Sequence, residues 1–338
     1  MSTRMWVLLA SLALLGLLSL LAYRIMVDVK PHTSRTIIDR SHQSEIEAIQ
    51  GRLMEHVRVL SVTIGERHLG RPKALQAAAD YIREIWTHDR LAVSEERFEA
   101  EGQTVVNVIV EQPGSVRPTE IIVVGAHYDS VPGTPGANDN GTGVALLLEM
   151  ARALKDTPVA RTIRYVAFVN EEPPYFFTES MGSRVHAHGA RSRAENVVAM
   201  ISLETLGYYS SVVGTQAYPF PLGFFYSRTG NFLGVVGNLR SRALVVDFLQ
   251  RFMAATDFPA EGVATFEWIP GINWSDHWSF WTEGYPAIML TDTAPFRYPH
   301  YHGPRDLPDH VVAPDFAKAS YGIIAAVHGL ATESKESP

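Results

Sequence analysis

The chain has 338 residues, of which 46% are hydrophobic and 19% are charged, and these values are ordinary for a globular protein. Its formal net charge of −7 leaves no basic face for nucleic acid. The sequence contains no cysteine, which excludes disulfides and thiolate ligands. Any bound metal must therefore be held by His, Asp and Glu side chains.

The first segment of the chain is apolar. Residues 5–23 carry no charge and are mostly Leu, Ala and Val, and a helix of that length reaches about 28 Å, roughly one hydrocarbon thickness. A cleaved signal peptide would have a shorter apolar core and a clear small-x-small site. We therefore expect residues 1–26 to form a single transmembrane helix that anchors the protein in a membrane, and residues 27–43 to form a linker.

Helices and strands alternate through the rest of the chain. Apolar residues recur at helical spacing in residues 44–66 and 71–91. Further along, short apolar runs predict strands at 105–110, 121–124, 162–169, 197–203, 263–268 and 287–290, and amphipathic patterns predict helices at 141–154, 242–255, 276–283 and 315–330. This alternation predicts an α/β fold with a mostly parallel central sheet, flanked by helices on both faces. We expect one domain over residues 44–334, in which residues 44–100 pack on the core.

Polar side chains follow the strand predicted at 121–124. His127 and Asp129 lie just beyond its carboxyl end, where open α/β sheets collect ligands and catalytic groups. Asp129 can accept the second N–H of the His127 imidazole and fix its tautomer, as carboxylates do for metal-bound histidines. Asp139 follows in a glycine-rich loop before a helix, where it is typical of an N-cap. Its two oxygens could also bridge two cations.

Carboxylates also end the next two strands. Glu171 and Glu172 follow the strand at 162–169, and Glu204 follows the strand at 197–203. Two adjacent buried carboxylates raise each other's pKa unless a cation compensates them. One of the pair could bind a metal while the other serves as a general base. His302 lies in the loop before the last helix, where the neighbouring His300 competes for any role assigned to it.

Counting donors favours a catalytic metal site. If the carboxylate of Asp139 is shared, each of two metal ions receives three protein ligands, and a catalytic zinc keeps a further position open for water. A set of nitrogen and oxygen donors without sulfur suits zinc and also admits cobalt or manganese. The predicted ligands are His127, Asp139, Glu172, Glu204 and His302.

Several ordered motifs make residues 105–330 similar to the co-catalytic dizinc aminopeptidase family, which includes bacterial leucyl aminopeptidases, glutamate carboxypeptidase II and glutaminyl cyclases. The motifs are GAHYDS, GANDNGTG, FVNEE, MGS, ISLETLG, SDHWSFWTEGYPAIMLTDT and YHGPRDLPD. The resemblance implies two zinc ions and a peptide substrate. It also implies an extracytoplasmic (periplasmic or extracellular) catalytic domain, against the basic residues that follow the apolar segment, which by the positive-inside rule favour the cytoplasm.

Carried over residue by residue, the resemblance makes His127, Asp139 and Glu204 the ligands of one zinc. Asp139, Glu172 and His302 then hold the other, Glu171 is the catalytic base, and Asp129 orients His127. Most members of the family have Asp in the place of Glu204. Residues 173–178 form an unusual insertion that we expect to shape the substrate pocket.

The predicted function is that of a zinc-dependent exopeptidase, most simply an aminopeptidase that uses metal-activated water. A glutaminyl cyclase with a single zinc, a carboxypeptidase and a non-catalytic receptor-like domain are the alternatives, because a fold alone does not fix a function. A carboxypeptidase needs a cationic group for the terminal carboxylate, which Arg297 or Arg305 could supply. We expect Tyr208, Arg297 and Tyr298 to contact the substrate.

Overall fold

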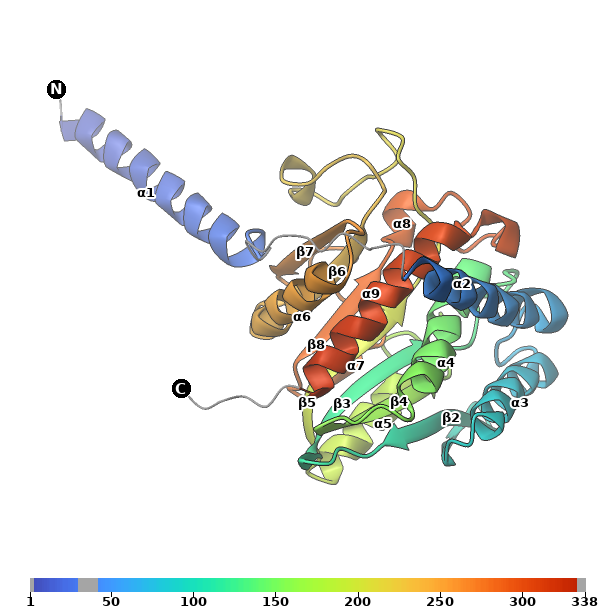
Figure 1. Cartoon of the computed structure of the whole chain (residues 1–338). Coiled ribbons are helices and arrows are strands. Elements are labelled where there is room, and N and C mark those ends of the chain that lie inside the picture. Colours follow the sequence, from blue (N-terminus) through green and yellow to red (C-terminus); the bar gives the residue numbers. More distant parts are fainter. Residues whose placement is uncertain (1–2, 30–41, 333–338) are drawn as a thin grey trace.

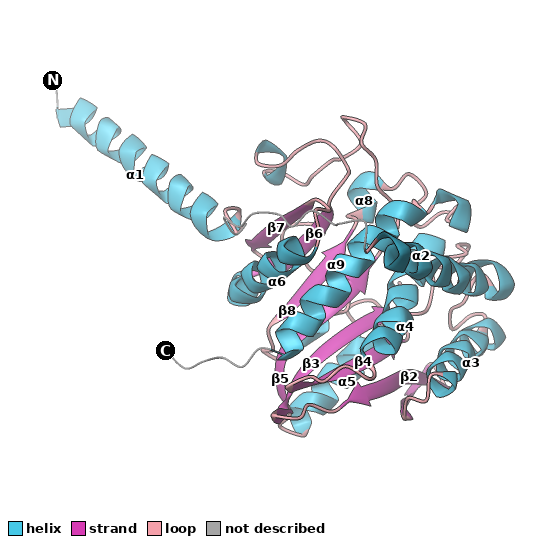
Figure 2. Cartoon of the chain, in the orientation of Figure 1, coloured by secondary structure: helices cyan, strands magenta, loops and turns pink. Residues whose placement is uncertain are grey.

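One sheet of eight strands organises the protein. The computed structural model describes residues 3–29 and 42–332, and Figures 1 and 2 show the sheet running through the centre of the molecule. Its strand order is β1-β2-β4-β3-β5-β8-β6-β7. The strands are β1 Val93–Ala100, β2 Gln103–Gln112, β3 Arg117–His127, β4 Arg161–Phe168, β5 Asn196–Glu204, β6 Leu233–Asn238, β7 Ala260–Thr265 and β8 Ala287–Thr291.

The four central strands β4, β3, β5 and β8 are parallel to one another. β1, β2 and β6 each pair antiparallel with a neighbour, and β7 pairs parallel with β6. The carboxyl ends of the central strands therefore meet at one edge of the sheet. The predicted α/β fold with a mostly parallel sheet is confirmed.

Helices cover both faces of the sheet. Their bounds are α1 Thr3–Met26, α2 Gln43–Arg58, α3 Pro72–His88, α4 Gly143–Leu154, α5 Gly182–Ser192, α6 Arg242–Ala255, α7 His277–Thr282, α8 Ala294–Arg297 and α9 Ala313–Thr332. Shorter turns are the π-helical η1 Val59–Ile64 and η2 Ala137–Thr142, and the 3-10 helical η3 Leu222–Phe224, η4 Leu239–Ser241 and η5 Pro308–His310.

Two hydrophobic cores result, one on each face. The larger core joins α2, α3, α4, α6 and α9 to the sheet, and the smaller core joins α5 and α7 to the other face. Strand β3 supplies both cores, because alternate side chains of a strand point to opposite faces. Ile122 and Val124 lie in the larger core, whereas Ile121 and Val123 lie in the smaller one. This double burial fixes the register of the strand that carries His127.

The transmembrane anchor predicted at residues 1–26 is wrong. Across residues 3–29 and 42–332, no helix combines the length and the apolar character that crossing a bilayer requires. Helix α1 forms over that segment and projects from the body of the protein (Figure 1). Most of the predicted linker at 27–43 lies outside the described residues, and the extracytoplasmic location of the domain stays a prediction.

The carboxyl end of α1 packs on the domain that contains the sheet. The Arg242 guanidinium donates to the carbonyl of Ile25 at 2.8 Å, and the Tyr23 and Phe225 rings are in contact with centroids 5.6 Å apart. Val29 is buried in the larger core, beside Gly262 of β7. Residues 27–29 therefore pack on the domain near β7.

Candidate metal centre

The five predicted ligands converge at the carboxyl edge of the central strands. His127 and Glu204 are the last residues of β3 and β5, while Glu172 lies four residues beyond the end of β4. Asp139 comes from η2, and His302 from the loop between α8 and η5. The strands place two of these side chains, and the segments outside the strands bring the other three to the same edge.

The donors form two groups that share Asp139. The Nε2 atom of His127 lies 3.4 Å from Asp139 Oδ1 and 3.3 Å from Glu204 Oε2. The Nε2 atom of His302 lies 3.1 Å from Asp139 Oδ2 and 3.3 Å from Glu172 Oε2. In each group the candidate ligand atoms all lie within 4.8 Å of one another. The two oxygens of Asp139 thus face different histidines, which is the arrangement that a bridging carboxylate needs.

A third group of donors overlaps these two. His127, Glu171 and Glu172 also bring ligand atoms within 4.8 Å of one another. The Oε2 atom of Glu171 is 3.8 Å from His127 Nε2, farther than either Asp139 or Glu204. Geometry therefore favours the two groups centred on Asp139 as metal sites, and leaves Glu171 beside them.

Several buried polar atoms of the centre make no hydrogen bond to any described residue. They include His127 Nε2, Asp139 Oδ1 and Glu172 Oε1. Buried polar groups without partners are costly, and native proteins have few of them. These atoms face one another across short distances and are nitrogen and oxygen donors of the kind that zinc binds. The residues therefore fit a metal ion.

The pKa values of the centre also indicate that it binds a cation. Burial raises the pKa of Glu172 to about 7, with the charge of Asp139 adding to the effect. Burial also raises the pKa values of Glu171 and Glu204. Burial alone would lower the pKa of His127, but the charges of Glu171 and Glu204 hold it well above its usual range. So many carboxylates cannot ionise together without positive charge, and divalent cations supply it.

Asp129 supports the centre through the backbone. Its two carboxylate oxygens accept hydrogen bonds from the backbone N–H groups of Glu171 and Glu172, each at 3.1 Å. Its Oδ1 atom lies 3.6 Å from His127 Nδ1, which is longer than a hydrogen bond. Asp129 therefore holds the turn that carries both glutamates, and its predicted role in orienting the imidazole stays a prediction.

Asp306 and Arg67 hold the loop that carries Asp139, and no role was predicted for either. The Asp306 carboxylate accepts from the backbone N–H of Asn138 at 2.8 Å and of Asp139 at 3.0 Å. Arg67 is fully buried and donates to the carbonyls of Tyr128, Pro135 and Gly136, at 2.6, 2.6 and 2.8 Å. A single arginine in a loop between helices gives no sequence signal for this role.

A chain of hydroxyl groups holds Glu204. Ser275 Oγ donates to Glu204 Oε2 at 2.7 Å, and Ser202 Oγ lies 2.7 Å from Ser275 Oγ. The neighbouring Asp276 is fully buried, and its pKa is raised by burial to about 7. Both residues belong to the SDHW part of a motif shared with the family, and no role was predicted for either. Ser275, which holds Glu204, lies 71 residues away from it in the sequence.

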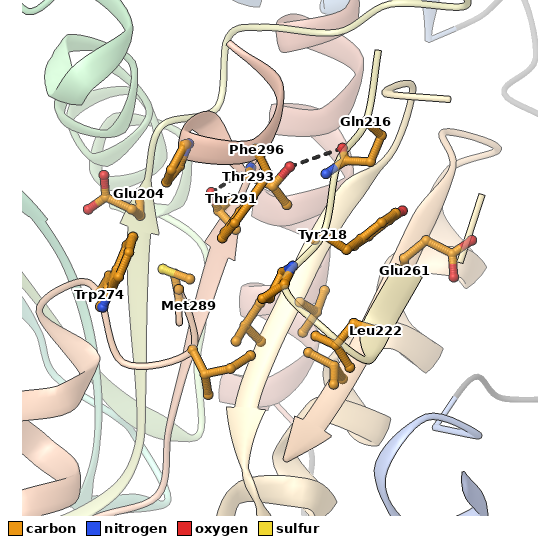
Figure 3. Close-up of a pocket in the computed structure, with 18 of the residues that line it drawn as sticks. Glu204, Gln216, Tyr218, Leu222, Glu261, Trp274, Met289, Thr291, Thr293 and Phe296 are labelled. Carbon is orange, nitrogen blue, oxygen red and sulfur yellow. Dashed lines mark hydrogen bonds between the residues drawn. The ribbon is translucent and has the colours of Figure 1, made fainter. Parts of the chain in front are cut away.

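An apolar pocket opens beside Glu204. It holds about 750 Å³ of space, solvent at its mouth included, and lies between β6, β7, β8 and the segment 208–232 (Figure 3). The Thr293 hydroxyl donates to the Gln216 side chain at 3.0 Å, and the Gln216 amide donates to a backbone carbonyl, so these polar groups are already paired. Its apolar walls include Leu222, Val235, Val236, Val263, Met289 and Phe296.

The three residues predicted to contact substrate lie outside this pocket lining. Arg297 is buried, donates to the Gln216 side chain at 2.7 Å and to the Phe232 carbonyl at 2.9 Å, and lies over the Phe232 ring. Tyr298 is buried and donates to Asp306 at 2.9 Å. Tyr208 is half-buried, with its ring against that of Tyr298. Arg297 and Tyr298 thus support the wall and the Asp139 loop from behind.

Comparisons with known proteins find similar chains. The model of peptidase family M28 matches residues 107–327. The uncharacterized protein YfbL of Escherichia coli is 35% identical over 285 residues, which cover 82% of this chain and 87% of that protein. Aminopeptidase YwaD of Bacillus subtilis is 51% identical over 71 residues, which cover 21% of this chain and 16% of that protein.

A solved structure shares the fold. The zinc aminopeptidase BSAP from Bacillus subtilis superimposes with a TM-score of 0.66 over 85% of this chain and 96% of that chain. The two sequences are 17% identical over this alignment. At that identity the likeness shows the fold alone.

Proposed function

The chain belongs to peptidase family M28 and is a metallopeptidase, and from this premise we propose that it removes N-terminal residues from peptides with the help of two zinc ions. One ion would be held by His127, Asp139 and Glu204, and the other by Asp139, Glu172 and His302. The observation that carries the proposal is the division of the Asp139 carboxylate, whose Oδ1 and Oδ2 atoms face different histidines at 3.4 and 3.1 Å.

The charge of the centre favours a substrate with a free amine. Glu171, Glu204 and Asp276 are buried carboxylates near the proposed ions, and a protonated terminal amine complements them. A carboxypeptidase would need a cation for the terminal carboxylate. Arg297, the buried candidate for that role, is already engaged by Gln216 and Phe232. The buried carboxylates therefore favour an aminopeptidase over a carboxypeptidase that would use Arg297.

Bound zinc would polarise the scissile carbonyl and lower the pKa of a water molecule towards 7. Glu171 lies beside the donors, and burial raises its pKa well above the ordinary value. Such a carboxylate can accept the proton of the attacking water and return it to the leaving amine. Asp129 fixes the position of Glu171, because it accepts the backbone N–H of that residue at 3.1 Å.

The pocket beside Glu204 would receive the side chain of the substrate's first residue. Two of its polar lining residues, Gln216 and Thr293, are paired with each other, and many of the other lining residues are apolar (Figure 3). Burying an apolar side chain there gains roughly 25 cal/mol for each Å² removed from water. The apolar walls of the pocket would thus supply much of the free energy with which the first residue of the substrate binds.

Metal titration and a blocked-substrate assay test the proposal. We expect two zinc ions per chain, hydrolysis of peptides with a free N-terminus, and loss of hydrolysis when that amine is acetylated. A glutaminyl cyclase, the alternative carried by the family resemblance, would bind one zinc and release ammonia from N-terminal glutamine. Equal rates on free and acetylated peptides would refute the aminopeptidase assignment.

A further inference from the structure

Three aromatic rings form a cluster next to the metal centre that the proposed mechanism does not use. The rings of Phe176 and Phe177 are stacked with centroids 4.0 Å apart, and Phe177 contacts Trp278 with centroids 4.5 Å apart. The side chain of Phe177 is 42% exposed, and the other two residues are half-buried. We call these residues the aromatic cluster.

The aromatic cluster is tied to the centre at both ends. On one side, the Tyr175 N–H donates to the carbonyl of Glu172 at 3.0 Å, so Phe176 and Phe177 begin one turn beyond a proposed ligand. On the other side, the Trp278 N–H donates to the carbonyl of Ser275 at 3.1 Å. Ser275 is the residue whose hydroxyl contacts Glu204. The cluster therefore connects the β4 side of the centre to the turn that supports the β5 side.

The sheet order separates the aromatic cluster from the pocket. The segment that carries Phe176 and Phe177 follows β4, whereas the pocket is lined from the end of β5 and from β6, β7 and β8. In the order β4-β3-β5-β8-β6-β7, the donors on β3, β4 and β5 lie between the two. A peptide with its first side chain in the pocket and its first peptide bond at the metals must continue towards the β4 side.

Two features of Phe177 reduce the stability of the fold. Its backbone lies in the left-handed region, with φ +64°, where a bulky residue is an outlier. Its large apolar side chain is also left partly in water. Strained backbone and exposed rings of this kind are found where the surrounding structure holds a residue for binding or catalysis.

We propose that the aromatic cluster binds the side chain of the second residue of the peptide substrate, the residue that becomes the new N-terminus, and that it selects aromatic side chains there. The inference rests on the proposed aminopeptidase function and adds a preference for the leaving part of the substrate. Phe177 offers the most exposed ring, and an aromatic side chain can stack on it or meet it edge-to-face. Phe176 stacks on that ring and Trp278 contacts it, and these contacts hold it in place.

A series of dipeptides with the same first residue tests the inference. We expect the wild-type zinc enzyme to cleave Leu-Phe and Leu-Trp with kcat/KM about tenfold above that for Leu-Ala and Leu-Gly, as one good ring contact allows. Phe177→Ala should reduce this ratio to about twofold or less while leaving kcat/KM for Leu-Gly and the zinc content unchanged. Phe177→Trp should restore the ratio.

Phe224→Ala is the matched control, because Phe224 is 78% exposed in the segment that carries the pocket wall and lies outside the aromatic cluster. It should keep the wild-type ratio. A wild-type enzyme without preference at the second residue would overturn the inference, as would a Phe177→Ala variant that loses Leu-Phe and Leu-Gly activity equally. Failure to cleave any of the four dipeptides would instead refute the proposed function itself.

Discussion

Removal of zinc should make the stability of this protein fall as the pH rises. Burial raises the pKa of Glu172 from 4.5 to about 7 in the metal-free fold. Between these two pH values the folded state holds a proton that the unfolded chain has lost. Because the folded state then binds more protons than the unfolded state, the free energy of unfolding decreases with increasing pH. The loss spans about pH 4.5 to 7.

The size of the effect follows from the same shift. Moving one carboxyl pKa from 4.5 to about 7 corresponds to about 3 kcal/mol of unfolding free energy. Asp276, with its pKa raised by burial to about 7, acts in the same direction. The two carboxylates share one cluster of charges, so their contributions do not simply add. We take about 3 kcal/mol for the centre, which lowers Tm by roughly 5–10 °C in a domain of this size.

His302 extends the trend to higher pH. Burial lowers the pKa of its imidazole, but hydrogen bonds to Asp139 and Glu172 raise it to about 10. A histidine with a raised pKa stabilises the fold fully below its unfolded value near 6.5, and this contribution is lost as the pH rises towards 10. Both kinds of group therefore make the metal-free protein less stable in alkaline solution.

Thermal unfolding followed by circular dichroism between pH 5 and 8.5 measures how the stability of the metal-free protein depends on pH. Chelator-treated protein should show a falling Tm, whereas protein reloaded with zinc should not, because zinc binds the deprotonated ligands. Metal-free Glu172→Gln should have a flatter profile below pH 7, since the titrating acid is gone. A metal-free Tm that is constant or increases with pH would show that the cluster of carboxylates does not control stability.

Three substitutions test single residues of the centre. Glu171→Gln should reduce kcat by roughly 10²–10⁴-fold, which is the usual contribution of a general base, and it should keep its zinc. Glu179 lies on the exposed part of the same loop, and Glu179→Gln should change neither kcat nor the zinc content. Ser275→Ala should weaken one of two zinc sites by about 10–100-fold in a competition titration, while Ser275→Thr retains affinity. Arg67→Met should destabilise the fold by about 3–5 kcal/mol in chemical denaturation, because it leaves several buried carbonyls unpaired. The nearby Arg71 forms an exposed salt bridge, and Arg71→Met should lower the free energy of unfolding by less than about 1 kcal/mol.

The proposed metal ligands could be predicted from the sequence because the fold places them by local rules. His127 and Glu204 end buried apolar strands, and Glu172 lies four residues beyond another. Parallel strands bring their carboxyl ends to one edge of the sheet. Asp139 and His302 lie in loops farther from the strands, so counting donors made them candidates and the family resemblance divided the five ligands between two ions, because a loop residue can lie anywhere that its chain can reach.

Strand β1 and Arg297 show where local patterns fail. The residues of β1, VSEERFEA, are mostly polar, because the strand lies at the edge of the sheet and only Ala100 at its end is buried. No apolar run marks such a strand. Arg297 was expected to face either substrate or solvent. It is instead buried by Phe232 and Gln216, partners that lie 65 and 81 residues away and leave no local signal.

The structure shows how Glu204 is held in the place where most members of the family have an aspartate. A glutamate has one more rotatable bond than the aspartate usual in the family, so its carboxylate needs additional restraint to hold a metal in fixed geometry. Ser275 provides that restraint through a 2.7 Å hydrogen bond, and Ser202, on the same strand as Glu204, holds the Ser275 hydroxyl in turn. The longer side chain of Glu204 therefore depends on Ser275 and Ser202 for its position. Replacing Glu204 by Asp alone should weaken metal binding, because the shorter carboxylate would lose the Ser275 hydroxyl.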